Sequence, residues 1–138
     1  MTPIRTVLFV CAHGAAKSVL AAADFQRLAD RRGLKLRAAA AGTDPDPEVS
    51  SWVVQALRED GIDVGDQRPR RVTRDDLAGA WRVVAFGCDL GGLAPPGLAV
   101  EQWGDVPAVG DNGNAARAAI TARLGRLLDD CGRAGAAP

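Results

Sequence analysis

Residues 7–18 of the chain read Val-Leu-Phe-Val-Cys-Ala-His-Gly-Ala-Ala-Lys-Ser. The apolar run that ends at Val10 does not alternate with polar residues, which is typical of a strand buried on both faces of a parallel sheet. Small residues follow, and the position of Ser18 indicates the start of a helix. The segment therefore predicts a buried strand over 4–10, joined to a helix by a loop that begins at Cys11.

The rest of the chain repeats this order of strand and helix. Further strands are expected over 35–41, 82–86 and 98–100, and the first helix is expected to stop at Gly33. The clearest helix is expected over 48–60 because its apolar residues recur at helical spacing. A short helix with Thr73 and acidic residues in its first turn, and a final helix capped by Asp111 after the loop 104–112, complete the series.

Strands that alternate with helices favour a parallel sheet covered on both faces. We expect an α/β fold over 1–138: a single domain with three layers, α/β/α, and a four-stranded parallel sheet. In such sheets ligands bind beyond the carboxyl ends of the strands. The loops at those ends begin at Cys11, Gly42 and Gly87, so the site is expected there.

Composition excludes several classes of function. The 138 residues include 17 basic and 17 acidic side chains, and this balance favours neither nucleic acid nor an anionic membrane as partner. The basic group Arg68, Arg70 and Arg71 is interpreted as the solvated edge of a loop. No stretch approaches transmembrane length. The cysteines at 11, 88 and 131 match no zinc spacing and no disulfide scaffold, so we expect a reducing, cytoplasmic compartment, with no metal and no cofactor.

The loop after the first strand has the composition of an oxyanion site. Its small side chains allow successive backbone N–H groups to converge on one point, and the helix behind them adds partial positive charge. The same charge favours the thiolate form of Cys11, which makes this residue the candidate nucleophile. The expected oxyanion-binding residues are Ala12, His13, Gly14, Ala15, Ala16, Lys17 and Ser18.

Two other interpretations of this loop remain open. A nucleotide-binding loop also places Lys and Ser at the start of a helix, but it needs glycines where this chain has Cys11 and Ala16. Alternatively, Cys11 is a buried structural thiol at the end of a strand, as free cysteines often are.

The chain resembles a known family at this point. The run 7–11, five further residues, a basic residue and Ser18 are similar to the low-molecular-weight protein tyrosine phosphatases and their sister group, the thioredoxin-coupled arsenate reductases. The likeness continues through 41–43, 56–69 and 83–89 to the loop around Trp103, and so covers nearly the whole chain. It implies the family fold and thiol chemistry on a tetrahedral oxyanion such as arsenate or phosphate, or on a phosphomonoester.

Departures from the family motif concern the groups around the nucleophile. The family has Arg before the serine where this chain has Lys17, and it commonly has Asn where Gly14 stands. A lysine keeps the positive charge and loses the planar fork that grips two oxygens. The family acid directly precedes a proline, whereas this chain reads Asp105-Val106-Pro107, which makes Asp105 the best candidate for the general acid at an altered spacing.

The second cysteine separates the two branches of the family. In the reductases a cysteine in the loop after the third strand attacks the arsenic adduct of the first, and Cys88 occupies that place. The third cysteine of that branch is absent, because Ala94-Pro95 stands in its neighbourhood and Cys131 is expected to be structural. The resemblance therefore implies reduction of a Cys11–Cys88 disulfide by thioredoxin or a small thiol. A buried core cysteine is the alternative for Cys88.

Other candidate residues are assigned lesser roles. His13 is expected to contribute only its backbone, and the three tryptophans are expected to pack in the core. The chain has no tyrosine, so the tyrosine pair that flanks some phosphatase pockets is missing.

Three functions remain open from the sequence. The first is an arsenate reductase, with Cys11 as nucleophile, Lys17 on the oxyanion and Cys88 as resolving thiol. The second is a phosphomonoester hydrolase with Cys11 as nucleophile and Asp105 as acid. The third is a regulatory module that binds an oxyanion without turnover. The first two make the chain an enzyme, and the third does not.

Overall fold

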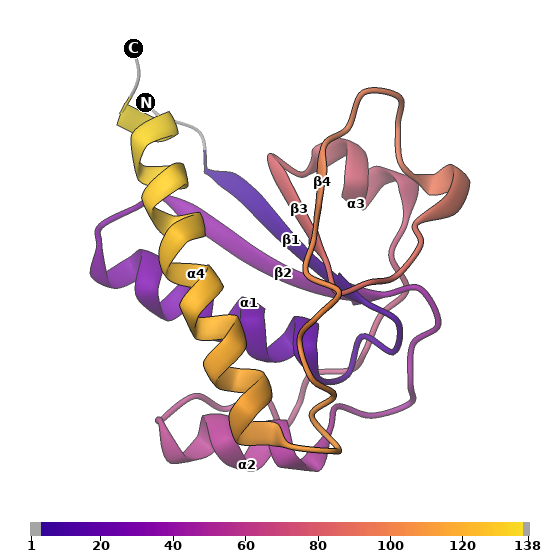
Figure 1. The fold of residues 1–138 in the computed structure, drawn as a ribbon, viewed down its shortest axis with the longest axis vertical. Coiled ribbons are helices and arrows are strands. Elements are labelled where there is room, and N and C mark those ends of the chain that lie inside the picture. Colours follow the sequence, from indigo (N-terminus) through magenta and orange to yellow (C-terminus); the bar gives the residue numbers. More distant parts are fainter. Residues whose placement is uncertain (1–3, 137–138) are drawn as a thin grey trace.

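The computed structural model describes residues 4–136, which form one four-stranded parallel sheet (Figure 1). Its order is β2-β1-β3-β4, so the strand that precedes Cys11 lies inside the sheet and β2 lies at an edge. The prediction of a parallel α/β sheet is confirmed. The strands are β1 (Arg5–Cys11), β2 (Leu36–Gly42), β3 (Arg82–Ala85) and β4 (Val100–Gln102).

Helices cover both faces of this sheet. They are α1 (Lys17–Arg31), α2 (Ser51–Glu59), α3 (Arg74–Gly79) and α4 (Gly113–Ala136), with a single 3-10 turn η1 (Gly91–Leu93) before β4. The helix predicted over 48–60 is shorter, and the strand predicted over 98–100 begins two residues later. The backbone N–H of Leu98 donates to the carbonyl of Pro95 at 3.2 Å, which keeps Leu98 in the turn instead of the strand.

The side chains of β1 alternate between two apolar cores. Val7, Phe9 and Cys11 belong to the core that α1, α2 and α4 share, whereas Leu8 and Val10 belong to the smaller core under α3. These five residues are all buried, as expected for an interior parallel strand. Cys11 therefore ends the strand on the side of α1, and this placement decides which elements surround its thiol.

Two helix starts test the capping predictions. Thr73 caps α3 as predicted, because its hydroxyl accepts from the N–H of Asp76 and the Asp76 carboxylate accepts from the N–H of Thr73. The prediction that Asp111 caps α4 was wrong: Asn112 Oδ1 accepts from the N–H of Ala115 at 3.0 Å. The N–H of Asp111 donates to the carbonyl of Ala108, which places Asp111 in the turn before the cap.

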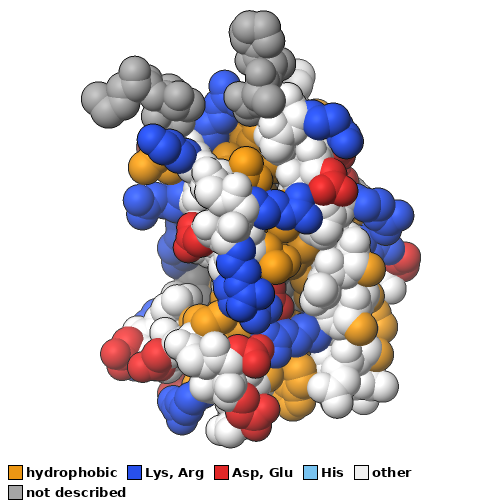
Figure 2. Space-filling view, turned by 90° about the vertical axis from the view of Figure 1, so that its left-hand side faces the viewer, with side chains coloured by type: hydrophobic (Ala, Val, Ile, Leu, Met, Phe, Trp, Pro, Cys, Tyr) orange, Lys and Arg blue, Asp and Glu red, His pale blue; other side chains and the backbone are white. Residues whose placement is uncertain are grey.

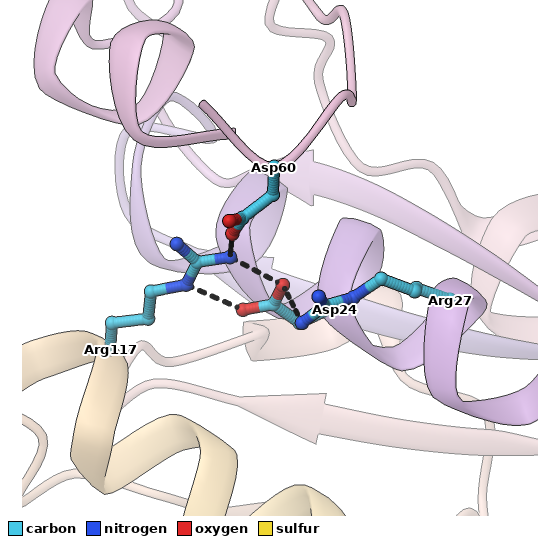
Figure 3. A network of polar contacts seen from close by, with 4 residues as sticks. All are labelled: Asp24, Arg27, Asp60 and Arg117. Atoms are coloured by element: carbon cyan, nitrogen blue, oxygen red, sulfur yellow. Dashed lines mark hydrogen bonds and ion pairs between the residues drawn. The ribbon is translucent and has the colours of Figure 1, made fainter. Parts of the chain in front are cut away.

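A buried ion-pair network holds α1 against α4 (Figure 3). The Asp24 carboxylate on α1 is 1% exposed and accepts hydrogen bonds from Arg117 on α4 at 2.8 and 3.0 Å. Arg27 also donates to Asp24, and Arg117 reaches Asp60 after α2 at 2.6 Å. Because the pairs join segments that lie far apart in the sequence, they fix α1 and therefore the loop at its start.

Candidate active site

The loop from Ala12 to Ala16 turns sharply between β1 and α1, against the end of β2. Gly14 adopts φ +60°, where glycine has no steric penalty. A Cβ on Gly42 would lie 2.6 Å from the Gly14 nitrogen, so neither glycine leaves room for a side chain. The two backbones therefore touch, and β2 forms the wall behind the loop.

The segment after β2 satisfies the outward carbonyl groups of this loop. Four backbone N–H groups of residues 43–50 donate to the backbone carbonyls of four residues between Cys11 and Ala15. The pairs are Thr43 to Cys11 at 3.2 Å, Asp44 to Ala12 at 2.7 Å, Asp46 to His13 at 2.9 Å and Ser50 to Ala15 at 2.8 Å. Because these carbonyls are bonded to residues 43–50, the N–H groups of the loop remain available to another acceptor.

The backbone N–H groups of the loop have no hydrogen-bond acceptor among the described residues. Among the hydrogen bonds of residues 4–136, none has the backbone N–H of residues 12–17 as its donor. The N-cap of α1 is Ala16, which has no side chain to satisfy the free N–H groups of the first turn. These donors and the positive end of the helix form a concave site that suits a tetrahedral oxyanion.

The Cys11 thiol lies at the base of this concave site. Its residue is 7% exposed, and its Sγ is 3.1 Å from Ser18 Oγ. Ser18 is fully buried in the first turn of α1 and is therefore held in place. The Cys11 thiol donates to the Ser18 hydroxyl oxygen, and Ser18 does not line the cavity itself.

A cavity of about 470 Å³ opens above Cys11. Its lining includes Cys11 and all of the expected oxyanion-binding residues except Gly14 and Ser18. It also contains residues that sequence reasoning missed. These are Asp46, Glu48, Ser50, Phe86, Ala108, Val109 and Gly110.

The Lys17 side chain lines the cavity but is bound to another loop. Its Nζ donates to the carbonyl of Val106 at 3.1 Å, across 89 positions of sequence. Val106 and Val109 are buried, so the segment between β4 and α4 is packed down over the site. The ammonium of Lys17 thus ties this segment to the start of α1, in addition to placing positive charge at the cavity.

The structure places Asp105 outside the cavity lining. Its carboxylate is 73% exposed and accepts from Arg123 on α4 with both oxygens. Arg123 also stacks over Trp103, which is buried against Phe9 and Phe86. Two other carboxylates, Asp46 and Glu48, lie at the cavity instead. Their signal in the sequence was the acidic turn at the carboxyl end of β2.

Cys88 lies on the opposite side of the end of β1 from the Cys11 thiol. Its Sγ contacts the carbonyl of Val10 at 3.5 Å, and it packs against the core under α3. Burial raises the pKa of the Cys88 thiol, and the negative charge of Cys11 raises it further. The two cysteines belong to different apolar cores. Cys131 is buried on α4, in the core.

His13 stands at the mouth of the cavity. Its Nδ1 is 3.2 Å from the Asp46 carboxylate, and both side chains are at least half exposed. Within the described part of the chain, no group of three or more His, Cys, Asp or Glu is arranged to hold a metal ion. None of its helices is both long and apolar enough to cross a membrane.

Comparisons with known proteins agree with this geometry. A putative arsenate reductase of Halobacterium salinarum is 31% identical over 97 residues, which covers 69% of this chain and 68% of the relative. The structure of the thioredoxin-dependent arsenate reductase Cg_ArsC1' of Corynebacterium glutamicum superposes with a TM-score of 0.80 at 27% identity. That match covers 96% of this chain, which spans 64% of the reductase chain.

A phosphatase structure is also similar. The low molecular weight protein tyrosine phosphatase of T. tengcongensis has a TM-score of 0.72 at 26% identity, over 91% of this chain and 95% of its own. The family model of low molecular weight phosphotyrosine protein phosphatases matches residues 6–92, the part that holds the oxyanion loop, the end of β2 and Cys88. The proteins that are similar to this chain include both arsenate reductases and a phosphatase. The loop with free N–H groups beside a buried thiol lies within the matched residues, and this chain belongs to the low molecular weight phosphotyrosine protein phosphatase family.

Proposed function

We propose that this protein is an arsenate reductase with Cys11 as nucleophile and Cys88 as resolving thiol. The observation that carries the proposal is the second cysteine: Cys88 Sγ contacts the carbonyl of Val10, the residue directly before Cys11. The placement of Asp105 favours it too, since that carboxylate is engaged by Arg123. The oxygen that leaves arsenate can take its proton from solvent, so this reaction does not depend on the Asp105 carboxylate.

In the first step, the loop N–H groups hold arsenate and the Cys11 thiolate attacks the arsenic atom. An S–As bond forms as one As–O bond breaks, and the hydroxyl oxygen of arsenate leaves as water with a proton from solvent. Formation of this bond removes the negative charge of Cys11. That charge is one cause of the raised pKa of Cys88, so the adduct favours the thiolate of Cys88.

In the second step, Cys88 attacks Cys11 Sγ. The S–S bond forms as the S–As bond breaks, and its electron pair reduces arsenic from the pentavalent to the trivalent state, which leaves as arsenite. Cys88 sits in a loop between Gly87 at φ +77° and Gly91 at φ +56°. These glycines are the positions at which the backbone can change direction to bring Cys88 around the end of β1. A dithiol such as thioredoxin, or a small thiol, then reduces the disulfide.

The test is the oxidation state of the protein after exposure to arsenate. We expect a Cys11–Cys88 disulfide by mass spectrometry and release of one arsenite per protein without added reductant. Cys11→Ser and Cys88→Ser abolish the disulfide, and the matched control Cys131→Ser keeps it because Cys131 is buried on α4. A wild-type protein that forms no disulfide and releases no arsenite with any reductant would refute the proposal.

A phosphomonoester hydrolase is the second candidate, and the cavity carboxylates favour it. Asp46 and Glu48 line the cavity, so either can deliver a proton to a leaving oxygen, as can Asp105 if its pair with Arg123 opens. This function predicts hydrolysis of p-nitrophenyl phosphate that is lost in Cys11→Ser and unchanged in Cys88→Ser. Dependence of turnover on Cys88 would contradict the hydrolase.

A further inference from the structure

The side chain of Gln102 bridges the backbone on the two sides of Gly87, directly before Cys88. Its Oε1 accepts from the N–H of Gly87 at 3.0 Å, and its Nε2 donates to the carbonyl of Cys88 at 3.2 Å. Gln102 is the last residue of the edge strand β4, and its backbone pairs with Ala85 at the end of β3. One amide therefore joins the edge of the sheet to the loop that carries the second cysteine.

The two hydrogen bonds lie on different sides of a backbone hinge. Gly87 adopts φ +77°, and the residue before it is fixed, because Phe86 is buried and its N–H donates to the carbonyl of Val10 at 2.9 Å. Rotation about the φ and ψ bonds of Gly87 leaves its own N–H in place, since that N–H belongs to the planar peptide group shared with Phe86. The same rotation displaces the carbonyl of Cys88, so it breaks the bond from Gln102 Nε2.

No other hydrogen bond among the described residues joins the backbone of the segment 88–93 to another element. The two hydrogen bonds that start from N–H groups of this segment also end within it. Side chains hold the segment as well, because Leu90 is buried in the core under α3 and Cys88 packs against that core. Of the backbone contacts, the one from Gln102 alone opposes movement of Cys88 away from this core.

We propose that Gln102 is a positioning residue that holds Cys88 in its core in the reduced protein and slows its attack on Cys11. The proposal rests on the proposed function, in which Cys88 is the resolving thiol. Because the two cysteines belong to different cores, Cys88 must leave its own core to reach Cys11 Sγ, and the bond from Gln102 Nε2 breaks in that movement. The bond exists only in the reduced form, where it opposes a disulfide before substrate arrives.

Ellman's reagent, an aromatic disulfide, separates the two thiol steps without arsenate. Cys11 attacks it, forms a mixed disulfide and releases a first thionitrobenzoate; Cys11 reacts first because burial raises the pKa of the Cys88 thiol. Cys88 then attacks Cys11 Sγ, and the protein disulfide forms as the bond to the second thionitrobenzoate breaks. Gln102→Met keeps the size of the side chain and loses both hydrogen bonds. We expect it to accelerate the second release about two- to tenfold, the effect of the one bond that the movement breaks.

The first release should keep its wild-type rate in Gln102→Met. Ellman's reagent is an anion and is attracted by basic side chains, which Figure 2 shows gathered across the middle of the side that carries β2. Gln102→Met changes no charge, so this attraction stays the same. The matched control is Gln55→Met, an exposed glutamine whose amide contacts Glu59 on the same helix, and it should leave both releases unchanged. Cys88→Ser should give the first release only.

Two further measurements distinguish a clamp on Cys88 from a general loosening of the loop. In a glutathione buffer the equilibrium constant for the Cys11–Cys88 disulfide should rise by the same factor as the second release, while the rate of its reduction stays unchanged. Hydrogen exchange of the Gly87 amide should accelerate in Gln102→Met. Equal second releases in wild type and variant, or no second release in either, would overturn the inference. A protein that shows the Gln102 effect and forms no arsenite supports the clamp and refutes the proposed function.

Discussion

Gly42→Ala should disturb the site without replacing any candidate catalytic side chain. Gly42 ends β2 and has no positive φ, so alanine is compatible with its backbone conformation. The added Cβ would meet only the backbone of the oxyanion loop: it would lie 2.6 Å from the Gly14 nitrogen and 2.9 Å from the His13 carbonyl carbon. The substitution therefore tests whether contact between the two backbones sets the position of the loop.

The size of the effect follows from these distances. Ordinary contact of a Cβ begins at 3.4 Å, so one backbone must retreat by about 0.8 Å, the difference from 2.6 Å. The segment after β2 holds the loop by its carbonyls and resists this movement. Overpacking of this kind costs about 1–3 kcal/mol, or roughly 3–15 °C in Tm for a chain of this size. A misplacement near 1 Å lowers the rate of a positioned reaction by about 100-fold.

Three measurements on the purified variant check this reasoning. Thermal unfolding gives the stability, calorimetry with arsenate and with phosphate gives oxyanion binding, and mass spectrometry gives the rate of Cys11–Cys88 disulfide formation. The control is Gly125→Ala on α4, where a Cβ meets nothing within 4 Å, and it should keep full binding and gain up to about 1 kcal/mol. If Gly42→Ala binds oxyanions and reacts within about threefold of the wild type, the contact does not position the loop.

Three further predictions concern the ion-pair network, the start of α4 and Cys88. Asp24→Asn places an amide donor against Arg117 and should cost about 2–4 kcal/mol in chemical denaturation, whereas Asp129→Asn, in an exposed pair, should change stability by less than about 0.5 kcal/mol. Asn112→Ala should cost about 1 kcal/mol through loss of the cap, and Asp111→Ala should be nearly neutral. Burial, and then the charge of Cys11, raises the pKa of Cys88, so its alkylation by iodoacetamide should still accelerate above pH 9. In Cys11→Ser the profile should move to lower pH, and an unchanged profile would contradict this electrostatic coupling.

Much of the site could be predicted because its signals are local. The apolar run before Cys11, the small residues after it and the helix start within eight positions each follow from short-range preferences. Parallel order of the strands then places the ends of β1, β2 and β3 at one edge. The resemblance to the phosphatase and reductase family indicated the same fold as these patterns, and the family model that matches residues 6–92 confirms this resemblance.

The contacts of individual side chains at the site could not be predicted in the same way. Lys17 contacts a carbonyl 89 residues away, and Asp105 meets Arg123 across the loop before α4. Both contacts depend on how the segment between β4 and α4 packs over the sheet, and that segment carries no periodic pattern. For the same reason the sequence placed Asp46 only in a loop and Glu48 only at the start of a helix, although both line the cavity.

The sequence by itself determined that a cysteine, the candidate nucleophile, follows a buried strand and precedes a helix, because strand pattern, loop composition and helix start are properties of adjacent residues. Only the tertiary structure decided how the backbone groups of this loop are oriented. Residues 43–50 hold its carbonyls on one side, and the end of β2 fixes its wall. It also decided that Cys11 and Cys88 face different cores, since the side of a sheet on which a loop residue lies depends on the packing of that loop and not on its own sequence.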